Sequence, residues 1–143
     1  MADKDTCPKH RQHPEYISRI YSFLKDNITT WGEEKINFIS LGVGIGDIEA
    51  GIASSMLLDK KQANFVLLDF SKYFLLSAYK KLVKTIPSDQ IYPIHCDFTR
   101  DANGYLSSLL GNLDGKRNVF FMCGELFGKY QPSILLHQLS ALM

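Results

Sequence analysis

Residues 36–53, INFISLGVGIGDIEAGIA, constrain the fold of this chain more than any other stretch. An apolar run over 36–41 ends in three glycines at alternate positions, Gly42, Gly44 and Gly46, and a segment with helical spacing follows at once. The pattern predicts a strand, a tight glycine turn and the start of a helix. Because such a turn has no side chains and precedes the free N–H groups of a helix N-terminus, a nucleotide-like ligand can approach its main chain closely.

Composition and charge narrow the class of protein. The 143 residues, 45% of them hydrophobic, are enough for one buried core, so a single globular domain is expected. The 16 basic and 15 acidic residues are well mixed and leave a formal net charge of +1. Proteins that bind polyanions usually concentrate their basic residues, so no nucleic-acid partner is expected.

Cysteine use and hydropathy indicate a reducing compartment. Cys7, Cys96 and Cys123 are widely spaced and lack the CxxC or Cys/His patterns of zinc sites, so neither a disulfide framework nor a metal site is predicted. The polar N-terminus lacks the apolar core of a signal peptide. No apolar run approaches the roughly 20 residues that a membrane-spanning helix needs. We therefore expect a cytoplasmic protein without a membrane partner.

Helical and strand patterns alternate along the chain. Residues 1–13 have no periodicity and are expected to form a flexible tail. Helices are expected over 14–27, 47–57, from the N-cap Ser71 to Pro87, over 105–110 and from Pro132 onward, and strands over 36–41, 64–68, 91–95 and 118–123. This alternation predicts an α/β fold over residues 14–143, a single three-layer α/β/α domain with a mostly parallel sheet. With only four strands, the sheet looks half built.

The spacing of the glycines separates one class of ligand from others. A dinucleotide fingerprint, GxGxxG, would need a glycine where Asp47 stands, and the Walker pattern GxxxxGK[ST] is absent. A carboxylate at the helix N-terminus suits the helix dipole but would repel a pyrophosphate. A ligand that has no phosphates and carries positive charge fits this turn better.

Three motifs resemble those of one family. The strand followed by LGVGIGD, Asp69 in VLLDFS and Asp97 in HCDF are similar to the cofactor motifs of class I S-adenosylmethionine-dependent methyltransferases. The resemblance implies the N-terminal half of that Rossmann-like fold, with S-adenosyl-L-methionine as cofactor. It implies that the turn lines the methionine part, that the two oxygens of Asp69 accept from the ribose hydroxyls, and that Asp97 flanks the adenine. The cofactor-binding residues implied in this way are Gly42, Val43, Gly44, Gly46, Asp69, Phe70, Asp97 and Phe98.

Longer phrases resemble the histidine-specific branch of this family, which includes the trimethylating enzyme of the ergothioneine pathway. These phrases are ISLGVGIGD, LLDFSKYFLLSA and RNVFFMCGELFGKYQP, and the resemblance covers residues 36–143. It implies methyl transfer to a small molecule, such as the amino acid histidine. The substrate contacts that it implies, in the loop after the fourth strand, are Glu125, Lys129 and Tyr130. The chain departs from the branch at Ser40, where an acidic residue is usual, and at Lys129, where asparagine is usual.

Other polar and aromatic residues near these motifs are interpreted as structural. Asp47 and Glu49 lie in the first turn of a helix, where carboxylates commonly complement the helix dipole. The residues interpreted as packed in the core are His95, Cys96, Tyr16, Tyr21 and Trp31. No residue is assigned as a catalytic group, because methyl transfer to a neutral amine needs mainly proximity and orientation.

Two functions from different classes remain open. In the first, the chain is an S-adenosylmethionine-dependent methyltransferase that acts on a small molecule. In the second, it is a non-catalytic cofactor-binding half domain or fragment, and a second copy or another partner chain covers the edge of the fourth strand. Oxidoreduction with NAD is disfavoured by Asp47 and by the lack of a catalytic domain.

Overall fold

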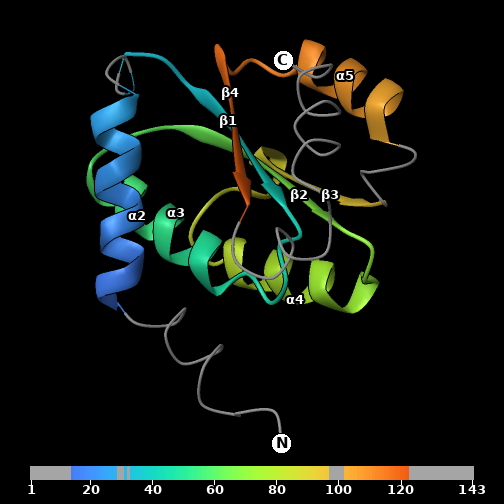
Figure 1. Ribbon diagram of the computed structural model, residues 1–143, viewed down its shortest axis with the longest axis horizontal. Helices are drawn as coiled ribbons and strands as arrows, with labels where there is room; N and C mark the ends of the chain where they lie inside the picture. The colour runs from blue at the N-terminus through green and yellow to red at the C-terminus, as the bar shows by residue number, and fades with distance from the viewer. Residues whose placement is uncertain (1–13, 29–30, 32, 97–101, 123–143) are drawn as a thin grey trace, which may run out of the picture.

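The computed structural model describes residues 14–28, 31, 33–96 and 102–122, and of residues 102–105 the backbone alone. Helices and strands alternate in the predicted order (Figure 1). The elements are α2 (Pro14–Asn27), β1 (Ile36–Leu41), α3 (Asp47–Leu58), β2 (Ala63–Asp69), α4 (Lys72–Leu82), the 3₁₀ turn η1 (Ser88–Gln90), β3 (Ile91–His95), α5 (Ala102–Asn112) and β4 (Arg117–Met122). The predicted tail over 1–13 and the predicted helix from Pro132 lie outside the described residues.

The strands form one parallel sheet in the order β3-β2-β1-β4. In this register, Ile36 of β1 lies opposite Ala63 of β2 and opposite Arg117 of β4. Every residue of β1 and β2 is buried, which explains the nearly continuous apolar sequence of these two strands. The predicted α/β class with a parallel sheet is confirmed.

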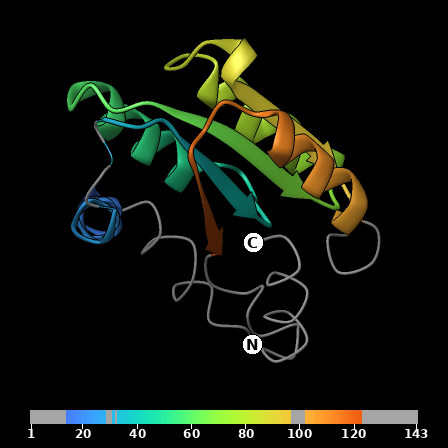
Figure 2. The same ribbon diagram turned by 90° about the horizontal axis from the view of Figure 1, so that it is seen from above.

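Helices cover both faces of the sheet (Figure 2). On one face, side chains of α2, α3 and α4 pack against Phe38 of β1 and Phe65 of β2, whose ring centroids are 5.3 Å apart. On the other face, Leu106 and Leu110 of α5 pack against alternate residues of the same strands, such as Ile39. Because successive side chains of a strand point to opposite faces, the two cores share their strands and give the three predicted layers.

Two helix boundaries differ from the prediction. α4 ends at Leu82 instead of continuing to Pro87, and the N–H group of Ile86 closes one further turn onto the Leu82 carbonyl oxygen at 2.9 Å. The helical conformation is disfavoured for Ile86, the residue before Pro87, so the chain leaves the helix before the proline. α5 spans Ala102–Asn112 and is longer than the predicted helix over 105–110. The prediction was too short because the residues at both ends of α5 are small or polar and show no apolar periodicity.

A row of three asparagines crosses the sheet at the amino ends of β2, β1 and β4. Asn64 Nδ2 donates to Asn37 Oδ1 at 3.0 Å, and Asn37 Nδ2 donates to Asn118 Oδ1 at 2.8 Å. Asn37 and Asn64 are buried, and a β-carbon at Gly115 would collide with the Asn37 side chain. Since buried amides need hydrogen-bond partners, this row favours the observed strand register over a shifted one.

Removal of the middle asparagine should destabilise the sheet. In Asn37→Leu, the Asn64 amide and the Asn118 oxygen lose a buried partner, so we expect the free energy of unfolding to fall by about 3 kcal/mol. Urea unfolding followed by circular dichroism measures this change. The exposed Asn112→Ala is the control, with an expected change within about 0.5 kcal/mol. Equal stability of Asn37→Leu and the parent protein would contradict the role assigned to the row.

Candidate functional site

The glycine turn joins the end of β1 to the start of α3. Its three glycines have positive φ, 71° at Gly42, 58° at Gly44 and 81° at Gly46. Residues with a β-carbon rarely adopt this conformation, which explains the alternate spacing of the glycines. The N–H groups of Gly42 and Val43 donate to the carbonyl oxygen of Leu68 in β2, at 2.8 and 3.1 Å. The turn is therefore attached to the neighbouring strand.

Two of these glycines have different surroundings. A β-carbon at Gly46 would lie 2.6 Å from both Cα and Cβ of Ala78, because α3 and α4 pack closely there. A β-carbon at Gly44 would have nothing within 4 Å. Gly46 is thus required for helix packing, whereas Gly44 presents its main chain to open space.

Asp69 connects the end of β2 to the glycine turn. Its side chain is largely removed from solvent, since the residue is only 6% exposed. Oδ2 accepts from the Gly44 N–H at 3.1 Å, and Oδ1 accepts from the Ser71 N–H at 2.9 Å. Each carboxylate oxygen has a second lone pair, so both oxygens retain acceptor capacity. The carboxylate that the resemblance assigns to a ribose diol therefore lies beside the turn.

The ends of β2 and β3 are joined in the same region. The Cys96 N–H donates to the Asp69 carbonyl oxygen at 3.2 Å, and His95 Nε2 donates to the Phe70 carbonyl oxygen at 2.8 Å. His95 is exposed, so its predicted place in the core is wrong; β3 is an edge strand, and its last residue faces solvent. Phe70 is 62% exposed and follows Asp69 directly, which leaves an apolar ring uncovered next to the carboxylate.

The turn lies at the carboxyl edge of the sheet, where the direction of strand addition changes (Figure 1). From β1 the chain adds β2 and β3 on one side, and β4 then pairs with the other side of β1. α3 packs on one face of the sheet and α5 on the other. In open α/β sheets, ligands bind outside the carboxyl ends of the strands at such a point.

The structure brings six of the predicted cofactor residues into this one region. They are Gly42, Val43, Gly44, Gly46, Asp69 and Phe70, with the side chain of Val43 buried in the core. The predicted residues that lie outside the described part of the chain are Asp97, Phe98, Glu125, Lys129 and Tyr130. Tyr21 and Trp31 are buried as predicted, whereas Tyr16 is at the surface, so its predicted place in the core is wrong.

Glu49, predicted to be a partner of the helix dipole, lies in the first turn of α3, where it is buried. The residue is 3% exposed, and Ser40 Oγ donates to Glu49 Oε1 at 2.6 Å. Removal from water disfavours the charged form, and this burial raises the pKa of Glu49 to about 7. The signal for its burial is its helical spacing, three, four and seven residues before Ile52, Ala53 and Met56 on the buried face of α3.

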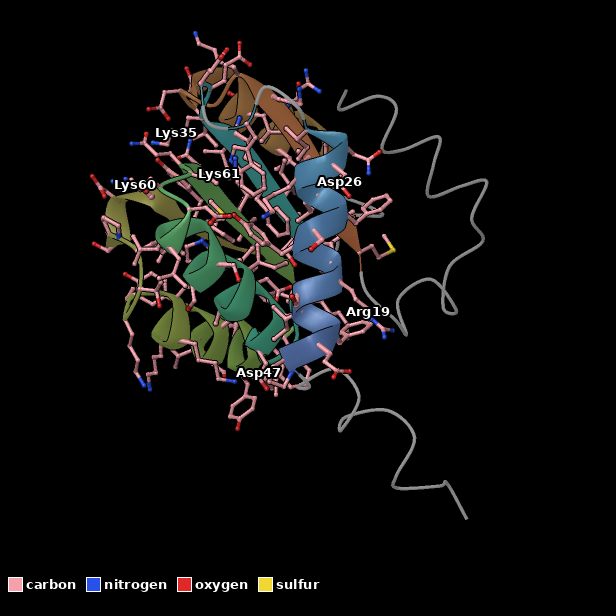
Figure 3. All side chains as sticks on the ribbon, turned by 90° about the vertical axis from the view of Figure 1, so that its left-hand side faces the viewer. Arg19, Asp26, Lys35, Asp47, Lys60 and Lys61 are labelled. Carbon is pink, nitrogen blue, oxygen red and sulfur yellow. The ribbon has the colours of Figure 1, made fainter. Side chains whose placement is uncertain are left out.

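Asp47, by contrast, fits its predicted place at the start of α3. Lys81 Nζ lies 2.6 Å from Asp47 Oδ1, and both side chains are partly exposed. Figure 3 shows Asp47 at the amino end of α3, close to α4. A carboxylate in the first turn complements the helix dipole, and the lysine of α4 adds a second favourable charge.

Metal ligands and membrane spans are not found in the described part of the chain. No three side chains of His, Cys, Asp or Glu come close enough together there to hold a metal ion. None of the helices described has both the length and the hydropathy that crossing a bilayer requires.

Comparison with known proteins identifies the fold. No protein-family model matches the chain, and no curated protein matches it. Among solved structures, it is similar to a protein from Methanococcus maripaludis described as an inferred S-adenosyl-L-methionine-dependent methyltransferase, with a TM-score of 0.55 and 13% sequence identity. The fold is Rossmann-like. The similarity covers 92% of this chain and 59% of the other, and at this identity it concerns the fold alone.

Proposed function

We propose that the chain binds S-adenosyl-L-methionine at the glycine turn and transfers its methyl group to a small molecule. The hydrogen bond from Gly44 N to Asp69 Oδ2 is the observation that carries this proposal. It places open main chain and a buried carboxylate side by side at the carboxyl edge of the sheet. A nucleoside without phosphates has a vicinal diol on its ribose, and the two hydroxyl groups can donate hydrogen bonds to such a carboxylate at this edge of the sheet.

The residues of this region fit the proposed cofactor. The open side of Gly44 leaves space for close approach to the main chain. Asp69 retains lone pairs for two ribose hydroxyls, and the uncovered ring of Phe70 offers the adenine an apolar surface. Asp97 and Phe98, in the segment after β3, are proposed to flank the adenine. The similar structure from Methanococcus maripaludis, an inferred S-adenosyl-L-methionine-dependent methyltransferase, supports the same cofactor.

The cofactor supplies an electrophilic methyl group on a sulfonium centre. The protein has to hold the acceptor in line with that group and exclude water. Proximity and orientation account for a large part of the rate enhancement in such a transfer. For the acceptor we propose an amino acid such as histidine, contacted by Glu125, Lys129 and Tyr130. This assignment rests on the resemblance of their segment to the histidine-specific branch.

Isothermal titration calorimetry tests the cofactor. We expect saturable binding of S-adenosyl-L-methionine and of its demethylated product, and none of NAD or ATP, because the turn has neither the GxGxxG nor the GxxxxGK[ST] pattern that holds their phosphates. Folded protein that binds neither of the first two ligands at about 1 mM would overturn the proposal. Tighter binding of NAD would favour an oxidoreductase instead.

Mass spectrometry of amino acids incubated with the protein and the cofactor tests the acceptor. We expect methylated histidine as the product. Methylation of a different amine alone would show that the acceptor is wrong and leave the methyltransferase activity in place.

A second function, a non-catalytic cofactor-binding half domain, is favoured by β4, which is an edge strand of the sheet that the described residues form. A groove between α2 and β4 is lined mostly by apolar side chains, and Phe23 in its wall is 66% exposed. In this alternative, a second copy of the chain or another partner covers the groove and extends the sheet. Light scattering combined with the transfer assay separates the two functions. A monomer that methylates an amino acid excludes the half domain, and an oligomer that binds the cofactor without turnover supports it.

A further inference from the structure

Glu49 is a buried acid whose neighbours in the sheet are apolar. Its hydrogen-bond partner Ser40 lies in register between Leu67 of β2 and Phe121 of β4. α2 packs against α3 as well, with Ile17 beside Gly51, two residues after Glu49 in α3. These neighbours offer a carboxylate no positive charge, so ionisation of Glu49 is disfavoured by its surroundings.

Two charged groups affect the ionisation of Glu49 in opposite directions. Asp47, two residues earlier in α3, disfavours ionisation, whereas Lys81 of α4 favours it. Lys81 is itself bound to Asp47, with 2.6 Å between Nζ and Oδ1. Three lysines labelled in Figure 3 lie toward the opposite end of the molecule from Asp47, namely Lys35, Lys60 and Lys61. Among the described residues, the cation whose charge favours ionisation of Glu49 is Lys81, which also pairs with Asp47, and burial raises the pKa of Glu49 to about 7.

The hydrogen bond between Ser40 and Glu49 connects the two ends of the glycine turn. Ser40 precedes the turn in β1, and Glu49 follows it in the first helical turn of α3. Residues 40–49 thus form a loop that this bond closes and that includes all three glycines. Glu49 is poorly solvated, so a cation bound at the turn would interact with its carboxyl group more strongly than two charges do across water.

We propose that Glu49 couples ligand binding at the glycine turn to the release of one proton. In the free protein its side chain is a neutral carboxylic acid, and a positively charged ligand converts it to a carboxylate. The O–H bond of Glu49 breaks, its electron pair stays on the oxygen and the proton goes to the buffer. The coupling rests on the proposed function, since the sulfonium and ammonium groups of S-adenosyl-L-methionine supply the positive charge. Glu49 thereby favours a cationic ligand over a neutral one.

Calorimetric titration with S-adenosyl-L-methionine, in two buffers with different heats of ionisation, measures the protons that the full chain releases. At about pH 6 we expect about one proton per ligand bound, and an affinity that rises about tenfold per pH unit up to about pH 7. Below that pH the ammonium group of the ligand stays protonated and contributes no proton. In Glu49→Gln, whose amide oxygen still accepts from Ser40, the release should disappear and the affinity should no longer depend on pH.

Two comparisons isolate the contribution of Glu49. Every other side chain around the turn, including His95 beside Phe70, is the same in Glu49→Gln and in the parent protein. The difference between this variant and the parent protein therefore reports Glu49 alone. The matched control Glu33→Gln removes an exposed glutamate and should release as many protons as the parent. Equal release by the parent and Glu49→Gln would overturn the inference.

Urea unfolding of the same proteins separates this inference from the cofactor proposal. The pKa of Glu49 in the folded protein, about 7, lies above its value in the unfolded chain, so the parent should lose stability relative to Glu49→Gln as the pH rises from about 5 to about 7. If this loss is seen but S-adenosyl-L-methionine does not bind, the proposed function fails and the coupling fails with it. If the ligand binds but the loss is absent, Glu49 is not a neutral acid and the inference alone fails.

Discussion

Gly46→Ala is expected to lower the free energy of unfolding by about 3 kcal/mol, and Gly44→Ala by about 1 kcal/mol. At Gly46 two effects combine. Its φ of 81° disfavours a β-carbon, and that carbon would lie 2.6 Å from the backbone of Ala78, so α3 and α4 would have to separate. At Gly44 the φ of 58° is also unfavourable, but the added methyl group enters open space.

Urea unfolding followed by circular dichroism gives both values under one set of conditions. Comparable losses for the two variants would contradict the packing assigned to Gly46.

Gly44→Ala also serves in binding measurements, because it should remain folded. Its methyl group occupies the space through which we propose the ligand reaches the main chain, so the affinity for S-adenosyl-L-methionine should fall at least about tenfold.

Asp69→Asn is expected to weaken the binding of S-adenosyl-L-methionine by about 100-fold. The amide has one acceptor oxygen instead of two and carries no charge, so the ribose diol loses a charged acceptor. If Oδ1 still accepts from Ser71, the new NH₂ group faces the N–H group of Gly44, and two donors oppose each other. We therefore also expect the free energy of unfolding to fall by about 2 kcal/mol.

Calorimetry and urea unfolding of the same Asp69→Asn sample distinguish lost binding from lost folding. The control is Asp89→Asn, which changes an exposed aspartate in η1 and should alter neither quantity. Unchanged affinity in folded Asp69→Asn would mean that the carboxylate only connects the end of β2 to the turn. That result would contradict its proposed contact with the ribose.

Much of the secondary structure can be predicted from the sequence because its signals are local. Short apolar runs indicate β1 and β3, and both strands have the predicted bounds. Ser71 is predicted as an N-cap, and its Oγ accepts from the Phe74 N–H at 3.3 Å. The alternate glycines predict a tight turn, which their positive φ confirms. Each of these features depends on bonds and torsions within a few residues.

The candidate site can be predicted only in part. Gly44 and Asp69 are 25 residues apart, yet the carboxyl ends of parallel strands meet at one edge, so a strand pattern is enough to bring them together. Glu49 has the helical spacing of a buried residue, but its charge argues for solvent when the sequence alone is considered. Its burial depends on Ser40 and on the apolar neighbours that β2 and β4 provide.

By itself, the sequence determined the order of the strands and helices and the conformation of the glycine turn, since φ preferences and hydrogen bonds within a helix act over a few residues. The strand order β3-β2-β1-β4 depends on tertiary contacts; among the described strands it puts β3 at an edge of the sheet and leaves His95 exposed. The tertiary structure also decided the packing of α3 on the sheet, which removes Glu49 from water. Solvation depends on every element that surrounds a group, and the same carboxylic acid in an isolated helix would be hydrated and ionised at neutral pH.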